Sequence, residues 1–243
     1  MGDAKARLYF VYHVHTMKRF SKRYKSNAEV VDKSKVYGIE EAVSLLKKTA
    51  NTKFTGSVEV HVHTAIDTKK TDQLIRGTVS LPHGTGKTKR VAAFVTESKE
   101  KDATAAGAVV VGGEELIKKI KETEITDFDV AVAEPAMMPK LAQVAKILGT
   151  RGLMPNPKTG TVGENIGALI KEIAGGKINF KNDDTGNVHV TIGKANFDDQ
   201  RLVENYQAFQ TAFNQGKPSG VKGIYIKSAY INVTMGPSLR IKL

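Results

Sequence analysis

Apolar and polar residues follow two different periods along the chain. Residues 57–67 and 74–82 alternate apolar with polar positions and are rich in β-branched residues, and the turn-rich segment 67–72 lies between them. This alternation predicts two strands of one sheet. Residues 39–54 instead repeat apolar positions at helical spacing, with acids first and lysines last, an order that suits the helix dipole. Residues 18–35 are basic and polar, and we expect them to be helical only in part.

The middle of the chain alternates short apolar strands with helical segments. Predicted strands cover 90–96, 108–113 and 128–135, and predicted helices cover 100–108, 114–122 and 138–149. Such alternation at short intervals predicts a parallel sheet built from βαβ units. Residues 151–165 are rich in Pro, Gly and Asn, and are therefore expected to form a loop.

The last third returns to the pattern of the first. A helix is predicted to precede the double glycine at 175–176, and residues 178–193 are predicted to form a hairpin that turns at 184–186. The segment 197–216 has five apolar residues on one helical face, and 223–236 forms a final predicted strand. Because the two ends of the chain are alike and the middle differs, one domain (85–175) is predicted to be inserted into another built from 1–84 and 176–243.

The charges follow the same division. The net charge of the whole chain is +12; residues 1–84 carry +7, residues 176–243 carry +4 and residues 85–175 carry +1. A surplus of this size favours a polyanionic partner, either nucleic acid or an anionic membrane, and it lies almost wholly in the domain built from both ends. The chain contains no cysteine, so a disulfide or thiolate metal site is excluded.

The N-terminal segment, residues 1–25, differs in composition from the chain that follows. Residues 1–25 lack the long apolar region and cleavage site of a secretory signal, and no run in the chain approaches the ~20 apolar residues that span a bilayer. A transit peptide remains open. Met17 begins a plausible basic start, so residues 1–16 are interpreted as a possible upstream extension.

Enzyme signatures are weak. Gly86-Lys87-Thr88 ends like a phosphate-binding P-loop, but the first glycine of that motif would fall at Leu81, and a strand rather than a helix follows. The double glycine at 112–113 has no third glycine at dinucleotide-binding spacing. The pairs His13/His15 and His61/His63 would need a third ligand to hold a metal, so no catalytic or metal site is predicted.

Residue types suited to RNA gather in the basic domain. Lysines neutralise phosphates, aromatic rings stack, and hydroxyl groups reach the ribose 2′-OH. Lys53-Phe54 precedes a strand, Lys177, Lys181 and His189 lie on the predicted hairpin, and Thr234 to Ser238 follow the last strand. Gly236 would let the backbone approach a ligand closely.

Four long segments resemble one known family. TDQLIRGTVSLPHGTGKTKRVAAF, LGTRGLMPNPKTGTV, GKINFKNDDTGNVHVTIGKANF and KPSGVKGIYIKSAYINVTMGPS, with the residues between them, are similar to the large-subunit ribosomal protein L-one family, the bacterial-type stalk proteins of the ribosome. The resemblance covers nearly the whole chain from about Met17. It implies an α/β protein of two domains: a split α+β sandwich built from both termini, and an inserted Rossmann-like domain.

The same resemblance implies a function. Members bind large-subunit rRNA, their mobile stalk accompanies exit-site tRNA, and many repress translation by binding their own operon messenger RNA. It implies no enzyme activity and no cofactor, and a cytoplasmic, ribosome-bound protein that meets other ribosomal components, is a monomer when free and binds no membrane. An organellar ribosome remains open. The motifs carry over these RNA-binding residues: Lys53, Phe54, Ser57, Glu59, Lys177, Lys181, Asp183, His189, Thr234, Met235, Gly236 and Ser238.

This chain departs from the family pattern beside that site. Thr55-Gly56 replaces a usual Asp-Glu, Asp184 a usual Lys and Lys181 a usual Arg, so bidentate phosphate contact is weakened there. Between the domains, Pro82, Gly84, Gly86 and Gly176 are predicted to form a hinge, since Pro fixes one backbone angle and Gly frees the next. Two other functions stay open: a nucleotide-using enzyme built on the middle domain, and a translational regulator that acts away from the ribosome.

Overall fold

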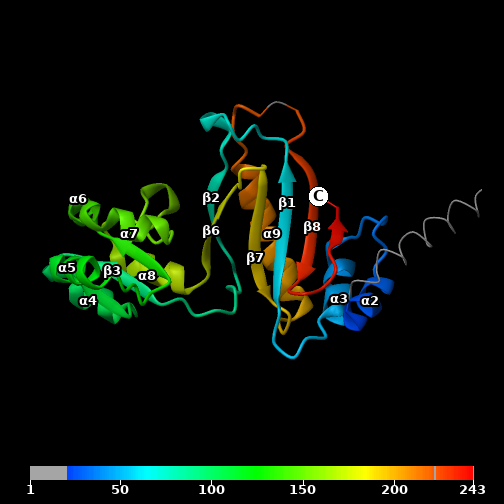
Figure 1. Cartoon of the computed structure of the whole chain (residues 1–243), viewed down its shortest axis with the longest axis horizontal. Helices are drawn as coiled ribbons and strands as arrows, with labels where there is room; N and C mark the ends of the chain where they lie inside the picture. Colours follow the sequence, from blue (N-terminus) through cyan, green and yellow to red (C-terminus); the bar gives the residue numbers. More distant parts are fainter. Residues whose placement is uncertain (1–20, 222, 243) are drawn as a thin grey trace, which may run out of the picture.

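Three β-sheets organise the chain in the computed structural model, which describes residues 21–221 and 223–242 (Figure 1). The possible extension at residues 1–16 and the pair His13/His15 lie outside the described residues. The sheets have four, two and three strands, and helices pack against them, so the fold is of the mixed α/β kind. No helix in the described part of the chain is both long enough and apolar enough to cross a membrane.

The four-stranded sheet is antiparallel and has the order β7-β1-β8-β9. Its strands are β1 (Ser57–Thr64), β7 (Asn187–Lys194), β8 (Ile226–Val233) and β9 (Leu239–Ile241). Every second residue of β1 is buried, which is the alternation expected of a sheet with one face in the core. Helices α3 (Ile39–Thr49) and α9 (Asp199–Gln215) cover the buried face, and α9 lies behind the strands in Figure 1. The other face is half-exposed and polar.

A two-stranded ribbon packs against α9, beside β7 (Figure 1). Strands β2 (Arg76–Ser80) and β6 (Lys177–Lys181) pair antiparallel, and the ring of Phe180 packs edge-on against Phe209 of α9 at 5.8 Å between centroids. The prediction that residues 57–67 and 74–82 form one sheet is therefore wrong. The alternating pattern is right for each strand, but β2 turns its apolar side to α9 while β1 joins β7 and β8.

The predicted hairpin at residues 178–193 is half right. A tight turn does run from Asp183 to Gly186, whose φ is +81°, and the Asp183 N–H donates to the carbonyl of Asn187 at 2.8 Å. Beyond one bridge between Asn182 and Val188, however, β6 and β7 separate into different sheets. Phe180 is held by the aromatic side chains of α9, and this packing draws β6 away from β7.

The middle of the chain forms three layers, as its βαβ pattern predicts. Parallel strands β4 (Val110–Gly112), β3 (Val91–Phe94) and β5 (Val130–Ala133) lie side by side in that order. Helices α4 (Glu100–Ala105) and α8 (Ile166–Ala174) pack on one face, while α5 (Glu114–Thr123), α6 (Met138–Leu141) and α7 (Ala145–Thr150) pack on the other. The single helix predicted for 138–149 is wrong in detail, since the 3₁₀ turn η5 (Ala142–Val144) interrupts it.

Short helices complete the structure. Helix α2 (Lys22–Glu29) begins at Ser21, whose hydroxyl accepts from the N–H of Tyr24, and it confirms that residues 18–35 are helical in part. Its Asn27 is buried and donates to the carbonyl of Thr49 at 2.8 Å, which ties α2 to the end of α3. The remaining 3₁₀ turns are η2 (Thr71–Gln73), η3 (Glu97–Lys99), η4 (Pro135–Met137) and η6 (Pro157–Thr159).

The chain passes between the ribbon and the parallel sheet twice, at Gly84 and at Gly176. Both residues have positive φ, +62° and +113°, and a Cβ on Gly176 would lie 2.4 Å from the Cα of Gly84. Gly176 could therefore not hold a side chain without a shift of the backbone, whereas at Gly84 it is the positive φ rather than lack of space that favours glycine. The hydrophobic core around the four-stranded sheet is separate from the two clusters that flank the parallel sheet.

Candidate nucleic-acid interface

Residues far apart in the sequence meet at one end of the four-stranded sheet. The Thr234 N–H donates to the carbonyl of Ser57 at 2.9 Å, and the Ser57 N–H donates to the Thr234 hydroxyl at 2.9 Å. Lys194, at the end of β7, donates to the Ser57 hydroxyl, also at 2.9 Å. These bonds join the ends of β1, β7 and β8, and they hold two hydroxyl groups beside one ammonium.

The turn after β8 is strained and exposed. Met235 has a φ of +67°, in the left-handed region that side chains rarely adopt, and it is 63% exposed. The carbonyl of Met235 accepts from the guanidinium of Arg23 at 3.1 Å, and the Gly236 N–H donates to Val233 at 2.8 Å. A Cβ on Gly236 would lie 2.6 Å from the Val233 side chain, so only glycine fits there. The turn is thus fixed in a conformation that presents Met235 to solvent.

A second exposed apolar side chain lies at the same end. Phe54 is 55% exposed, and it belongs to the loop that enters β1, in which the Thr52 hydroxyl donates to the Phe54 carbonyl. Lys53 is exposed beside it, and Ser238 is exposed in the turn that enters β9. Ring, thioether, hydroxyl and ammonium groups therefore surround one corner of the sheet. This is the combination that structured RNA requires.

Glu59 lies one row further along the outer face of β1. It stands opposite Thr191 of β7 and Asn232 of β8 in the register, and its carboxylate is 3.9 Å from the ring of His61. A carboxylate at this position repels phosphate but accepts hydrogen bonds from base amino groups and 2′-OH groups.

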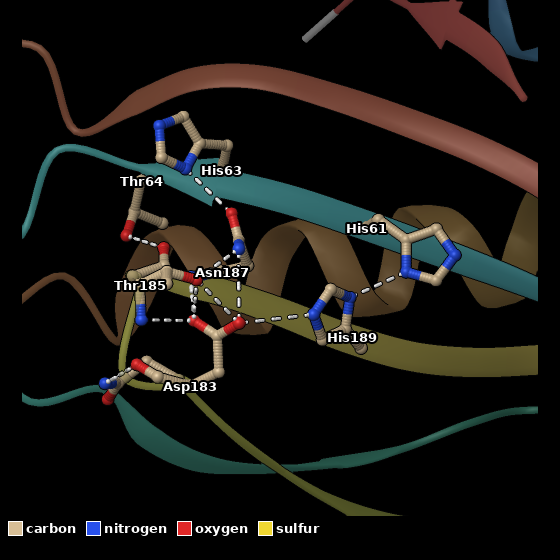
Figure 2. A network of polar contacts seen from close by, with 9 residues as sticks. His61, His63, Thr64, Asp183, Thr185, Asn187 and His189 are labelled. Carbon is tan, nitrogen blue, oxygen red and sulfur yellow. Dashed lines mark hydrogen bonds and ion pairs between the residues drawn. The ribbon is translucent and has the colours of Figure 1, made fainter.

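Asp183 and His189 lie towards the opposite end of the sheet (Figure 2). Asp183 accepts hydrogen bonds from the backbone N–H groups of Thr185 and Asn187 at 2.9 and 2.6 Å, and its carboxylate is 3.6 Å from the ring of His189. Partial burial raises the pKa of the Asp183 carboxyl, but the hydrogen bonds from Asn187 and Thr185 outweigh it and hold that pKa well below the usual range. Asp183 therefore stays ionised and orders the turn.

The histidines of the outer face contact one another and their neighbours. The Nδ1 atoms of His61 and His189 are 2.7 Å apart, and His63 Nδ1 is 2.7 Å from the side-chain oxygen of Asn187 (Figure 2). The prediction that His61 and His63 share one face of a strand is confirmed. Within the described residues, no group of three or more His, Asp or Glu side chains is arranged to hold a metal.

The two lysines of β6 belong to the ribbon rather than to the four-stranded sheet, and Lys181 lies two residues before Asp183. Lys177 is only 17% exposed and pairs with Glu172 at 2.8 Å, whereas Lys181 is exposed and lies opposite Arg76 in the ribbon. The structure thus brings seven of the twelve predicted residues to one corner and places Glu59 beside them. Asp183 lies about 20 Å away, since six residues of β1 at ~3.3 Å each separate Ser57 from the Asn187 end, whereas His189 stands opposite His61, only about 13 Å along the strand. The seven are Lys53, Phe54, Ser57, Thr234, Met235, Gly236 and Ser238.

Sequence reasoning missed three residues of this corner and its sheet. Arg23 and Lys194 contact the predicted residues across large sequence separations, and Tyr230 stands opposite His61 on the outer face. The alternation within 226–233 was a usable signal for Tyr230, because buried residues at 229, 231 and 233 turn it outward. No comparable signal marks Arg23.

The segment that resembles a P-loop has a structural role. Lys87 to Arg90 lead directly into β3, and the Lys89 ammonium donates to the carbonyl of Lys177 at 2.9 Å. Burial lowers the pKa of Lys89. The side chain of Lys89 therefore links the two segments that connect the ribbon to the parallel sheet.

Comparison with known proteins gives one consistent result. Residues 46–237 match the Ribosomal protein L1p/L10e family. Over 226 residues the chain is 50% identical to the Large ribosomal subunit protein uL1 of one Thermus thermophilus strain, a match that covers 93% of this chain and 98% of that protein. The proteins of the same name from Fervidobacterium nodosum and Mycobacterium sp. (strain KMS) are each 48% identical, over 93% and 92% of this chain and 97% and 94% of theirs.

Proposed function

Because this chain belongs to the Ribosomal protein L1p/L10e family, we propose that it is a structural component of the large ribosomal subunit that binds large-subunit rRNA. The family is a non-enzymatic one. The observation that carries the proposal is the corner where Thr234 and Ser57 hydrogen-bond across 177 residues of sequence, with exposed Phe54 and Met235 on the adjoining loops. The charge agrees with it, because +11 of the net +12 lies in residues 1–84 and 176–243.

The binding mode is docking of a rigid corner onto folded RNA. Lys53, Lys194 and Arg23 attract phosphates, the hydroxyl groups of Ser57 and Thr234 meet the ribose edge, and Phe54 and Met235 pack on sugars or bases. The strained turn at Met235 is fixed before RNA arrives, so little ordering is left to oppose binding.

The first test changes the corner itself. We expect Thr234→Ala combined with Met235→Asp to lower the affinity for a large-subunit rRNA transcript about a hundredfold, since it removes a hydrogen bond and adds a charge that repels phosphate. Filter binding at several salt concentrations measures the affinity. Ile125→Asp, which makes the same kind of change at a 68% exposed site in the middle part, serves as the control. Equal affinities of the double variant and the wild type would sink the proposed interface.

The domain boundaries belong to the same proposal. We take residues 85–175 as an inserted domain and the remainder as the RNA-binding domain. A short turn in place of residues 85–175 is therefore expected to leave rRNA affinity within a few-fold of the full chain. A log–log salt slope of about 0.7–0.9 per neutralised phosphate is expected for both proteins. Loss of binding in the shortened chain would place essential contacts in the middle part.

The wider cellular role follows from the resemblance described above. We propose that the neutral middle domain acts as a lever of the mobile stalk, which helps exit-site tRNA move and leave, and that the free monomer represses translation from its own operon messenger RNA. Ribosome-bound protein in the cytoplasm is the expected location. RNA crosslinking in cells tests these roles directly: large-subunit rRNA alone among the crosslinked RNAs would remove the messenger proposal.

A further inference from the structure

A row of planar side chains crosses the outer face of the four-stranded sheet. The register sets His61 of β1 opposite His189 of β7 on one side and opposite Tyr230 of β8 on the other. Tyr230 in turn stands opposite Arg240 of the edge strand β9. Neighbouring strands are about 4.8 Å apart, so the four side chains span about 15 Å. We call Arg240, Tyr230, His61 and His189 the planar row.

The two outer members of the planar row, His189 and Arg240, are exposed, His61 and Tyr230 between them are half-buried, and the two histidines are held in place by contacts. The planar row lies on the face opposite α9, where His61 and His189 point away from the helix (Figure 2). The side chain of His189 is 54% exposed, and its ring meets that of His61 edge-on at 4.9 Å between centroids. His61 is fixed from both sides, because Nδ1 contacts His189 at 2.7 Å and Nε2 contacts the Asn232 oxygen at 3.0 Å. Rings held in this way lose little freedom when a ligand stacks on them.

Positive charge lies at one end of the planar row, on strand β9, rather than at its centre. The edge strand contributes Arg240 and, beyond it, Lys242, and within residues 21–221 and 223–242 neither forms an ion pair. The centre of the face holds Glu59 with Asn232 and Thr191 in the next row. A phosphate is therefore attracted to the rim and repelled from the centre. The centre offers ring planes and hydrogen-bonding groups instead.

The absence of apolar anchors argues against a protein occupant. The large hydrophobic side chains that are exposed in the described part of the chain are those of Val30, Val36, Phe54, Val109, Ile125, Ile224 and Met235. None of them occupies an outward position of β1, β7, β8 or β9. Tyr230 and Arg240 are residue types that protein interfaces also favour, but with no large apolar side chain around them they fit better the stacking planes with adjacent cations that unpaired nucleotides need.

We propose that the planar row is a stacking platform for unpaired RNA bases, with Tyr230 and His61 beneath the bases and Arg240 and Lys242 beside the phosphates. The inference rests on the proposed function, since it assigns part of the bound RNA to the sheet face next to the Ser57–Thr234 corner. The row carries one or two bases, and Glu59, Asn232 and Thr191 meet their hydrogen-bonding edges. The RNA bound by this protein therefore includes unpaired nucleotides adjacent to its folded portion.

The test separates stacking from phosphate contact. The probes are a single-stranded RNA hexanucleotide with 2-aminopurine at its centre, the same hexanucleotide in a duplex, and a large-subunit rRNA transcript. The full-length variants are Tyr230→Ala, Tyr230→Phe and His61→Ala, and Lys242→Ala serves as the phosphate control. Circular dichroism and thermal melting establish that each variant folds.

Stacking predicts a distinct set of results. Wild type and Tyr230→Phe quench the single-stranded probe and leave the duplex unchanged, while Tyr230→Ala and His61→Ala lose the quenching. Tyr230→Ala weakens binding to the rRNA transcript about tenfold with an unchanged salt slope, because a stacked ring neutralises no phosphate. Lys242→Ala lowers that slope by about one.

Several results would overturn the platform. They are absence of quenching by the wild type, quenching by Tyr230→Ala equal to that of the wild type, or a changed salt slope in Tyr230→Ala. Reduced ribosome association of Tyr230→Ala with unchanged affinity for the transcript would show that this face binds a protein instead. Failure of the proposed function looks different, because the wild type would then not bind the transcript at all.

Discussion

Two polar side chains, Asn205 and Asp183, hold the backbone in position near Gly84 and at the turn before β7. Asn205 of α9 is fully buried; it donates to the carbonyls of Gly84 and Ile192 at 3.0 and 2.7 Å and accepts from the His83 N–H at 3.1 Å. Asp183 does similar work at the turn before β7. Because a buried backbone group without a partner is costly, such residues determine which path the chain follows.

Asp183 makes stability depend on pH. Its pKa is lower in the folded protein than the value near 3.9 of an unfolded chain, so its stabilising effect is present above about pH 4 and lost as pH falls towards the folded pKa. Asp183→Asn is expected to lower the free energy of unfolding by roughly 1 kcal/mol at pH 7, a figure kept small because the side chain is 39% exposed. Urea unfolding at pH 7, 5 and 3 should show the deficit shrinking below pH 4. A deficit that is constant with pH would contradict this account.

The left-handed backbone conformation of Met235 exposes its side chain but lowers the stability of the folded protein. Glycine adopts a φ of +67° without strain, so Met235→Gly is expected to raise the free energy of unfolding by about 0.5–1 kcal/mol. The same change should weaken rRNA binding, because the exposed thioether is lost. Thermal melting and filter binding measure the two effects. Met235→Ala keeps the strain and removes the side chain, so it should lose affinity without the gain in stability.

At the scale of elements, α9 joins the four-stranded sheet to the ribbon. Its Leu202 and Tyr206 are buried in the same hydrophobic cluster as the strands, while Phe209 and Phe213 contact Phe180 of β6. Phe213 also stacks on Tyr225 at 5.1 Å. The ribbon has only two strands and could not stand alone, so its order depends on this aromatic packing.

Removing one ring of α9 tests that dependence. Phe209 is 1% exposed, and Phe209→Ala is expected to lower the free energy of unfolding by about 3–5 kcal/mol. Hydrogen exchange should accelerate first in β2 and β6, since these strands lose their main support. Phe54→Ala, at a 55% exposed ring, should cost less than about 0.5 kcal/mol. Similar losses in the two variants would mean that α9 does not hold the ribbon.

Local patterns predicted most elements of this fold correctly, and the resemblance of four long segments predicted membership of the family. The periodicity identified α3, α9 and the βαβ units of the middle, because each of these segments has a single apolar face. The periodicity did not predict which strands pair with one another. The alternation in residues 57–67 shows which side chains face inward, but nothing in it shows that β1 pairs with β7 and β8 rather than with β2.

The candidate site shows the same limit. The motifs predicted Ser57 and Thr234 as RNA-binding residues, and in the structure the two are hydrogen-bonded to each other. The motifs also predicted Lys177 as an RNA-binding residue, yet its side chain is mostly buried and paired with Glu172. The sequence contained no signal for Arg23, because its contact with Met235 depends on how α2 packs. The packing of α2 depends in turn on the buried Asn27, which bonds the end of α3. Side-chain environment, unlike residue type, is set by tertiary packing.

At the scale of the whole molecule, two lengths of chain link the ribbon to the parallel sheet. They approach closely where Gly84 faces Gly176, and the Leu81 N–H donates to the Gly176 carbonyl at 3.3 Å. Gly86, with a φ of +71°, packs against Lys194 and Phe197. Our prediction that Pro82, Gly84, Gly86 and Gly176 form a hinge therefore concerns a small region in which backbone conformation is tightly specified.

Side chains at two of these glycines test the hinge. Gly84→Val with Gly86→Val is expected to leave both parts folded but to shift the distribution of distances between them. The chain has no cysteine, so Ile125→Cys and Lys227→Cys can carry dyes for single-molecule energy transfer without background labelling. Gly107→Val is the matched control, because Gly107 also has a positive φ but lies in open space away from the crossing. An unchanged distribution in the double variant would remove the hinge assignment.

The pairing of β1 with β8 has a consequence for the order of events during synthesis. Everything that builds the parallel sheet and its helices is contiguous, from Val91 to Ala174, so that part can fold while the chain is still growing. The four-stranded sheet cannot, because β1 waits for two strands from the last third of the chain. A nascent chain is therefore unable to form the proposed RNA-binding corner until β8 and Thr234 have been synthesised.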